Sequence, residues 1–317
     1  MTHEIDRILD TVRDAGRGIL VTLLRTTGST YRRPGARAVI TENGSTCGLV
    51  SGGCIERDLR ERMTEWMRDD MLDFRPRLIT YDSTTDADLV FGSGLGCRGT
   101  LELLIEPFDA VHPPAIAAFQ WNGREPVVWT TYYKDREVLV EVIRPPRAIA
   151  VFGNGVDVEP VVALAERLGF RVARAFQPAL DAAIVMTHNF LKDVELLEML
   201  LPSPIPYVGV LGPKQRGAEL VAHLSDEARA HAHRLRSPIG LDLGGDTPEE
   251  IALSVIAEVQ AVLNGRDGRA LQERRAPIHD PEQALTMCHP ERSEGPGWQG
   301  GTSSAPPSRP GSSLRSE

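Results

Sequence analysis

The stretch from residue 148 to residue 175 constrains the fold of this chain more than any other segment. An apolar run (Ala148–Phe152) leads into a glycine loop, then into a helical pattern that ends near Gly169, then into a second strand pattern (Arg171–Ala175). This order is typical of a βαβ unit, in which a helix connects two parallel strands. The second half of the chain is therefore predicted to form an α/β domain on a parallel sheet.

The connection that follows this unit is unusually short. Further strand patterns occur at Ala182–Thr187 and Tyr207–Leu211, and each leads into a helical segment. Only the six residues Phe176–Asp181 separate the strand at 171–175 from the next one, whereas a parallel crossover takes about a dozen residues or more. We therefore predict a shortened sheet, in which these two strands are antiparallel or are not neighbours.

The first part of the chain, up to about Pro107, mixes helix and strand patterns in another order and is predicted to be α+β. Apolar residues recur at helical spacing over 4–15, and Asn43-Gly44 lies between two strand patterns, which is the strongest short hairpin signal. A second hairpin is expected over 126–143, turning at Lys134–Arg136. The other expected elements are strands at 18–25, 37–41, 46–50, 78–81 and 100–105, a helix at 55–71, and a last helix that starts at a capping box, Thr247–Glu250, and stops at Asn264-Gly265.

These patterns divide the chain into three parts. We assign the α+β domain, including the second hairpin, to residues 1–145 and the α/β domain to residues 146–271, with the boundary at Pro145-Pro146. Residues 272–317 are predicted to be a disordered, low-complexity tail. From His289 to Glu317, 29 residues include five Pro, five Gly and seven Ser, too little apolar surface to offset the entropy of ordering.

Charge and composition exclude several classes of protein. The formal net charge of −9 argues against non-specific electrostatic binding of nucleic acid. No apolar run reaches the roughly 18 residues of a membrane span, and the N-terminus lacks the order of a signal peptide, so we expect a cytoplasmic protein without a membrane partner. The cysteines are too few and too scattered for a disulfide framework or a CxxC zinc site; they are Cys47, Cys54, Cys97 and Cys288.

The strongest candidate site is the run Ser51-Gly52-Gly53-Cys54-Ile55-Glu56, between a strand and a helix. Backbone N–H groups of a glycine turn, together with a helix N-terminus, form a place where an anion such as a phosphate can bind. The same environment favours the thiolate form of a cysteine. A tight turn beside a buried thiol is the alternative interpretation.

Two other glycine loops are candidates. Residues 92–99 contain four glycines together with Cys97 and the cationic Arg98, so a ligand could approach the backbone closely; a flexible connector is the alternative. Residues 28–35 contain Arg32 and Arg33, whose guanidinium groups could bind an anion; a solvated loop is the alternative.

In the α/β domain the candidates lie where strands end, because open α/β sheets bind ligands at that edge. Gly153-Asn154-Gly155 begins a dinucleotide fingerprint, but Val158 takes the place of its third glycine. The second strand ends at Arg174 without a carboxylate, so this arginine is either a contact for a 2′-phosphate or a surface residue. His188 is a candidate ligand or a structural histidine, and Lys214 adds positive charge.

Taken together, these motifs resemble the XdhC/CoxI family of xanthine dehydrogenase accessory proteins. The resemblance covers about residues 4–271, and its motifs lie at 28–56, 94–107, 152–160, 181–189, 207–214 and 238–258. It implies a Rossmann-like second domain and a maturation factor rather than an enzyme, although catalysis is not excluded. Such a protein would bind the molybdenum cofactor (molybdopterin) and protect it while its metal gains a sulfur. It would then deliver the cofactor to an apo molybdenum hydroxylase, with a cysteine desulfurase as a second partner. The resemblance is also compatible with a protein that forms a homodimer.

The resemblance also implies which residues contact the cofactor. Cys54 and Cys97 are expected as thiol contacts to a soft molybdenum centre, and we predict that they face one cleft. No residue is assigned a catalytic role. The full set of expected contacts is Ser51, Gly52, Gly53, Cys54, Glu56, Gly94, Gly96, Cys97, Arg98, Gly153, Gly155, Asp157, His188 and Lys214.

Departures from the family pattern leave other functions open. Arg98 stands where the family usually has glycine, Val156 where it often has histidine, and chain is missing between the strands at 171–175 and 182–187. A side chain at Arg98 could block its loop or pair with a phosphate. The alternatives are an NAD(P)-binding oxidoreductase, a thiol-redox protein that uses Cys54 or Cys97, and a degenerate family member that acts as an interaction scaffold.

Overall fold

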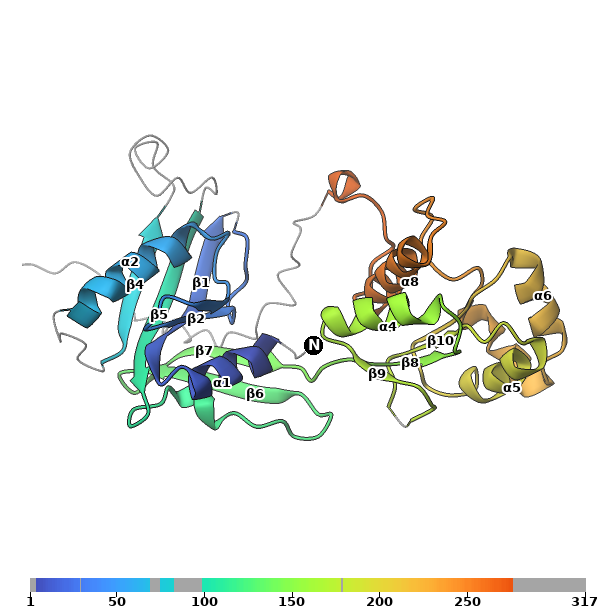
Figure 1. The fold of residues 1–317 in the computed structure, drawn as a ribbon, viewed down its shortest axis with the longest axis horizontal. Coiled ribbons are helices and arrows are strands. Elements are labelled where there is room, and N and C mark those ends of the chain that lie inside the picture. The colour runs from blue at the N-terminus through green and yellow to red at the C-terminus, as the bar shows by residue number, and fades with distance from the viewer. Residues whose placement is uncertain (1–3, 29, 69–74, 83–98, 178, 276–317) are drawn as a thin grey trace, which may run out of the picture. The chain divides into compact units, whose positions relative to one another are not determined.

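The computed structural model describes residues 4–28, 30–68, 75–82, 99–177 and 179–275 (Figure 1). In the N-terminal part, five antiparallel strands form a sheet in the order β3-β2-β1-β5-β4. The elements are α1 (Glu4–Asp14), β1 (Arg17–Gly28), β2 (Arg37–Thr41), β3 (Thr46–Gly48), α2 (Cys54–Arg68), β4 (Arg77–Asp82) and β5 (Gly99–Asp109). The predicted Asn43-Gly44 hairpin is confirmed, since β2 and β3 pair on either side of it.

The two helices of this part cover opposite faces of the sheet. Alternate residues of β1 point to opposite sides, so Ile19 and Val21 pack with Ile55 and Leu59 of α2, whereas Leu20 packs with residues of α1. These side chains are fully buried, and each contributes on the order of 1.5–3 kcal/mol to folding. The core of this part is therefore aliphatic and lies on both sides of one central strand.

A two-stranded antiparallel sheet follows, formed by β6 (Val127–Tyr133) and β7 (Arg136–Ile143), after the short helix η1 (Ala115–Ala118). The turn between the strands is at Lys134-Asp135, where both residues have positive φ angles, which confirms the predicted hairpin. Ile143 of β7 belongs to the same buried cluster as α1. The end of this hairpin is thereby fixed beside the first helix.

The C-terminal part contains a five-stranded parallel sheet in the order β12-β11-β10-β8-β9. Both β9 and β10 pair with β8, so they are not neighbours, as the short connection predicts. The order corresponds to the common six-stranded dinucleotide-binding sheet without its third strand. The elements are β8 (Ala148–Phe152), α4 (Val158–Arg167), β9 (Arg171–Ala173), β10 (Ala182–Val185), α5 (Phe190–Leu200), β11 (Tyr207–Val210), α6 (Lys214–Ala222), α7 (Asp226–Ala230), η2 (Ala232–Arg234), β12 (Leu235–Arg236), α8 (Pro248–Leu263) and η3 (Leu271–Glu273).

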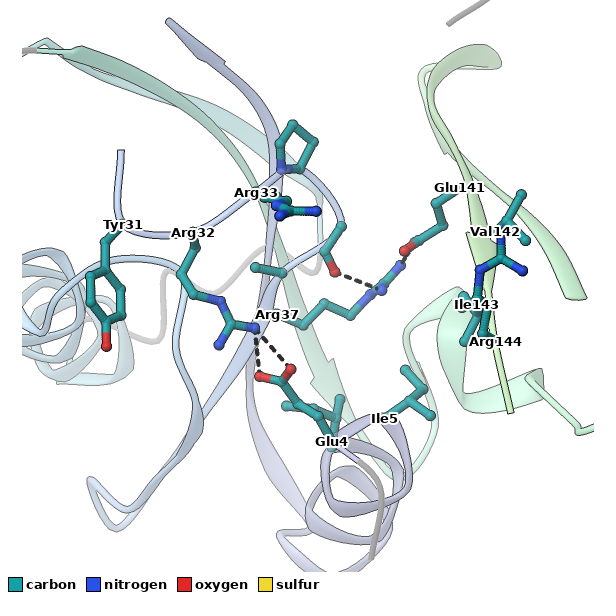
Figure 2. Close-up of a pocket in the computed structure, with 14 residues that line it drawn as sticks. Glu4, Ile5, Tyr31, Arg32, Arg33, Arg37, Glu141, Val142, Ile143 and Arg144 are labelled. Carbon is teal, nitrogen blue, oxygen red and sulfur yellow. Dashed lines mark hydrogen bonds and ion pairs between the residues drawn. The ribbon is translucent and has the colours of Figure 1, made fainter. Parts of the chain in front are cut away.

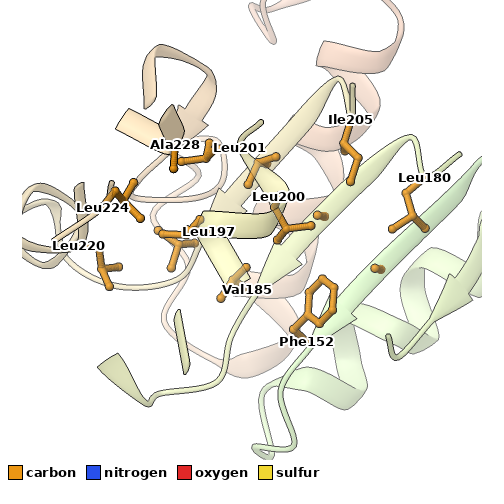
Figure 3. Packing of buried hydrophobic residues seen from close by; sticks show 14 of the residues in the cluster. Phe152, Leu180, Val185, Leu197, Leu200, Leu201, Ile205, Leu220, Leu224 and Ala228 are labelled. Atoms are coloured by element: carbon orange, nitrogen blue, oxygen red, sulfur yellow. The ribbon is translucent and has the colours of Figure 1, made fainter. Parts of the chain in front are cut away.

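Both faces of the parallel sheet are covered by helices. Ala150 and Phe152 of β8 belong to a cluster with α5, α6 and α7, shown in Figure 3. Ile149 and Val151, which point the other way, pack with α4 and α8. This two-sided burial explains why the strands read as continuous apolar runs rather than as alternating patterns.

The last helix starts as its sequence predicts. The Thr247 side chain accepts a hydrogen bond from the Glu250 N–H, and the Glu250 carboxylate accepts one from the Thr247 N–H, so the capping box is complete. Beyond the helix, Gly265 has a positive φ angle of 64° and ends it. The predicted tail from residue 272 lies mostly outside the described residues.

Candidate functional site

The turn between β3 and α2 is built around one buried carboxylate. Oε1 of Glu56 accepts hydrogen bonds from the N–H groups of Val50 (2.7 Å) and Ser51 (2.8 Å), and its Oε2 accepts one from the Ser51 hydroxyl. The Ser51 Oγ also accepts a bond from the Gly53 N–H, at 3.1 Å. Glu56 is only 2% exposed, so this network fixes the backbone that precedes the helix.

The two glycines of this turn lie at the surface with open space beside them. A Cβ added at Gly52 or at Gly53 would meet no heavy atom within 4 Å. Gly53 has a φ of 111°, a conformation that L side chains rarely adopt, and Cys54 is the first residue of α2. The structure thus places a rigid, open turn directly before the first-turn N–H groups of a helix, which have no acceptor within the helix itself.

The second glycine loop of the sequence lies outside the described residues. This applies to Gly94, Gly96, Cys97 and Arg98, and to the side chain of Cys54. The expectation that the two thiols face one cleft therefore stays a prediction. Ser51 and Glu56, expected as cofactor contacts, use their side chains to hold the turn; their contact with a ligand also stays a prediction.

At the carboxyl edge of the parallel sheet, the glycine loop after β8 is packed tightly. A Cβ at Gly153 would come within 2.3 Å of the Met186 carbonyl oxygen, so only glycine allows this approach. Gly155 lies against Asp157 and His188, which are joined by a hydrogen bond with Oδ2 and Nε2 2.9 Å apart. His188 has a positive φ of 56°, an uncommon conformation for histidine. The structure thus brings four of the predicted residues together.

Arg174 and Lys214 extend this edge. The Arg174 guanidinium donates a hydrogen bond to the Gly153 carbonyl oxygen at 2.6 Å, so it braces the glycine loop. Lys214 is exposed at the start of α6.

Asp193 holds two neighbouring residues at the same edge, and sequence reasoning missed it. Its carboxylate is 1% exposed and accepts hydrogen bonds from the Thr187 hydroxyl and from Arg216, the latter at 2.7 Å. Because the same helix also contains Glu195 and Glu198, no sequence signal distinguished Asp193 from its neighbours.

The arginines of the third loop line a pocket of about 520 Å³ (Figure 2). Arg32 makes two hydrogen bonds to the Glu4 carboxylate, at 2.7 and 2.8 Å. Arg37 pairs with Glu141 of β7 and donates to the Gly35 carbonyl oxygen at 3.0 Å. Arg32 and Arg33 therefore belong to a pocket rather than to a solvated loop. Glu141 gave no signal in the sequence, because 104 residues separate it from its partner.

None of the helices in the described part of the chain combines the length and the apolar composition of a membrane span. Within the same residues, no group of three or more His, Cys, Asp or Glu side chains could hold a metal ion.

The amino-acid sequence matches two family models, one in each part of the chain. Residues 12–82 match the XdhC and CoxI family, and residues 149–259 match the XdhC Rossmann domain. The chain belongs to the XdhC/CoxI family. This confirms the resemblance drawn from the motifs and places the β3–α2 turn and the edge of the parallel sheet within family-typical segments.

Curated relatives align with most of the chain. A Bacillus subtilis (strain 168) protein, named as a probable xanthine dehydrogenase subunit, is 26% identical over 80% of this chain and 95% of its own length. The molybdenum cofactor insertion chaperone PaoD of Escherichia coli (strain K12) is 26% identical over 78% of this chain and 84% of its own. A crystal structure described as a xanthine dehydrogenase from Bacillus halodurans has the same fold, with a TM-score of 0.68 at 24% identity, over 89% of this chain and 99% of that one.

Proposed function

We propose that this protein is an accessory factor that binds the molybdenum cofactor and assists its insertion into a molybdenum hydroxylase of the xanthine dehydrogenase type. The observation that carries the proposal is the similarity to a molybdenum cofactor insertion chaperone over 78% of this chain, in a sequence that matches family models in both parts. In this role the cofactor is cargo rather than a resident group, so the site must hold it and release it.

The turn at Ser51–Gly53 suits the anionic end of that cargo. Molybdopterin carries a phosphate, and the open glycine backbone before α2 offers N–H groups at a helix N-terminus, where a phosphate is stabilised. The Glu56 network keeps this turn rigid without filling the space beside it. Cys54 begins the helix, and we propose that it and Cys97 contact the molybdenum centre through sulfur.

Retention of the cofactor by cysteine variants tests this proposal. Purified protein is mixed with molybdenum cofactor under anaerobic conditions and desalted, and the pterin that remains bound is oxidised and measured by fluorescence. We expect the wild type to retain pterin, and Cys54→Ala and Cys97→Ala to retain about tenfold less. Cys47→Ala is the matched control, because Cys47 is half-buried in β3, outside the proposed site. Retention by the wild type no better than that of an unrelated protein would overturn the proposal.

Delivery needs its own experiment. Loaded protein is added to an apo molybdenum hydroxylase, and the recovered activity is measured with and without a cysteine desulfurase. We propose that sulfuration takes place while the cofactor is bound, so activity should recover further when the desulfurase acts before transfer than when it acts after. Equal recovery in both orders would restrict the role to insertion.

Nucleotide binding at the parallel sheet is a second candidate. It is favoured by the glycine loop that follows β8 and approaches the Met186 backbone, and by the match to a Rossmann domain. The test is titration of NADH or NADPH followed by nucleotide fluorescence. A change in nucleotide fluorescence that is seen with the wild type and lost in Arg174→Gln would support a contact of this arginine with the nucleotide. No change in fluorescence at millimolar nucleotide would reject the candidate.

A further inference from the structure

One edge strand in the described part of the chain lacks the usual protection of a sheet edge. A sheet edge carries unpaired backbone N–H and C=O groups, and proteins shield it by keeping the strand short or by placing charges on it. In this protein β3, β9 and β12 have three residues or fewer, while β4 and β7 contain charged residues. The remaining edge strand, β6, has seven residues (Val-Val-Trp-Thr-Thr-Tyr-Tyr) without a charge, a proline or a glycine. β6 is therefore the edge that a further strand can join.

The outer edge of β6 has backbone groups without partners among the described residues. In an antiparallel strand, successive residues direct their N–H and C=O groups to opposite edges. Tyr133 precedes the two-residue turn of the hairpin and is opposite Arg136, so its backbone groups face β7. The register shift of the hairpin skips a residue of β7, so β6 itself stays regular. The backbone groups of Val128, Thr130 and Tyr132 therefore face the open edge, and no other described residue forms a hydrogen bond with them.

The side chains of the same three residues lie on the solvent face of the hairpin. Val128 is 66% exposed, Tyr132 is 55% exposed, and Thr130 is partly exposed. On β7, Val142 lies opposite Val128 and is 51% exposed. The other face of β6 packs on the core, where Thr131 is buried. An exposed apolar face beside an open edge is typical of a surface that contacts another protein.

We propose that β6 pairs with β6 of a second copy of this chain, antiparallel and about a twofold axis at Thr130. A twofold axis through a continuous sheet requires that opposite residues point to the same face, so the pairing is centred on a residue. With the centre at Thr130, Val128 lies opposite the partner's Tyr132, and Tyr132 lies opposite the partner's Val128. This register joins the free N–H and C=O groups of all three residues to those of the second copy.

The side chains are self-complementary in this register, and this selects a second copy as the occupant of the edge. A tyrosine opposite a valine and a threonine opposite a threonine are cross-strand pairs that stabilise antiparallel sheets. The Val128–Tyr132 pair forms twice, once on each side of Thr130, and no charged residue of β6 opposes this. The inference does not depend on the molybdenum-cofactor proposal, since it concerns β6 alone.

The mass of the full chain in solution tests the pairing. Multi-angle light scattering after size-exclusion chromatography is measured over a range of protein concentrations, and we expect a dimer that dissociates on dilution. Val128→Lys with Tyr132→Lys places like charges opposite each other at both pairs, so the dissociation constant should rise at least about tenfold. Val128→Lys with Tyr132→Glu places opposite charges there and should restore the dimer. The exposed positions of both side chains leave the core of each variant intact.

The matched control adds the same two charges outside β6. It is Val111→Lys with Val142→Lys, because both valines are exposed and Val142 belongs to the same face of the hairpin. We expect its dissociation constant to stay within about twofold of the wild type. A loss as large as that of Val128→Lys with Tyr132→Lys would show that the face rather than the edge makes the contact, and would overturn the inference.

A cross-link tests the register. In a hydrogen-bonded antiparallel pair the two Cα atoms are about 5.5 Å apart, which is within the range of a disulfide. Thr130→Cys should therefore form a covalent dimer under mild oxidation, and a reductant should reverse it. Val142→Cys should give no more covalent dimer than the wild type, whose own four cysteines set the background.

Several results would overturn the inference. One is a wild type that stays monomeric at every concentration, and another is a dimer that Val128→Lys with Tyr132→Lys leaves unchanged. A monomeric wild type that binds an apo molybdenum hydroxylase, with binding lost in the same variant, would assign the edge to that client instead. Failure of Tyr132→Glu to restore the dimer, or of Thr130→Cys to cross-link it, would overturn the register centred on Thr130.

Discussion

At the scale of single residues, Glu56 decides whether the turn before α2 keeps its shape. Its buried carboxylate accepts three hydrogen bonds, two from backbone N–H groups and one from Ser51. In Glu56→Gln, a neutral amide oxygen would replace a charged acceptor of two buried backbone N–H groups, and the loss should cost about 1–3 kcal/mol of unfolding free energy. Urea denaturation measures the loss. Glu61→Gln on the exposed side of the same helix is the control and should stay within about 0.5 kcal/mol; equal effects would show that the network contributes nothing.

The stability of the protein should respond very differently to a methyl group added at two of its glycines, Gly153 and Gly52. In Gly153→Ala the new Cβ would lie 2.3 Å from a backbone carbonyl oxygen at a φ of 146°, so we expect a loss of about 3 kcal/mol or more. In Gly52→Ala the methyl group meets open space, so stability should change by less than about 0.5 kcal/mol. The same methyl group would stand in the proposed phosphate position, and cofactor retention should fall. Thermal unfolding and the pterin assay separate these effects; unchanged retention in Gly52→Ala would count against a cofactor at this turn.

At the scale of elements, the capping box of α8 links stability to pH. Hydrogen bonds from the Thr247 and Asp246 backbone N–H groups hold the pKa of Glu250 below its ordinary value in the folded protein. A carboxyl with a lowered folded pKa stabilises the fold above its unfolded pKa, and this contribution is lost as pH falls through the folded pKa. Stability of the wild type should therefore fall more steeply below about pH 4.5 than that of Glu250→Gln.

Glu249→Gln provides the control for this helix, because it removes the same charge from the first turn without breaking a capping bond. Its stability should keep the pH dependence of the wild type. Thr247→Ala should cost about 1 kcal/mol at neutral pH, the usual value for loss of an N-cap side chain. If Glu249→Gln and Glu250→Gln reduce the pH dependence of stability equally, the helix dipole rather than the capping box is the cause of that dependence.

The elements were the most predictable part of this molecule, because their signals are local. Each of these signals lies within a few residues: the spacing of apolar residues, the Asn43-Gly44 turn and the Thr247–Glu250 capping box. The six residues after Ala175 are likewise enough to show that β9 and β10 cannot be parallel neighbours. Contacts between distant residues left no such trace. The Arg37–Glu141 pair closes a pocket across 104 residues, and the Asp157–His188 pair joins two loops 31 residues apart. The glycine turn was therefore predictable as a local structure, whereas the pocket walls were not; its role as a binding site stays a prediction.

At the scale of the whole molecule, the buried clusters separate along the chain. The clusters of the N-terminal part contain residues between Ile5 and Ile143, whereas those of the parallel sheet contain residues between Ala148 and Leu263. Since no cluster of the described residues draws on both ranges, each range has a core of its own. A segment with its own core can in principle fold alone.

We therefore expect fragments 1–145 and 146–275 to fold separately, each with a cooperative thermal transition. Three of the four tryptophans lie in the first fragment and none in the second, so in a chain that ends at residue 275 tryptophan fluorescence follows the first domain alone. The near-UV circular dichroism of Tyr207, which is buried and is the only tyrosine after residue 146, follows the second fragment. Thermal transitions of the fragments that match those of the longer chain would establish two folding units, and a fragment 146–275 without a cooperative transition would refute them.

The same fragments test where the cofactor binds. Because the glycine turn and both proposed cysteine contacts lie before residue 145, pterin retention should stay with the first fragment. Retention by the second fragment alone would move the cargo site to the parallel sheet.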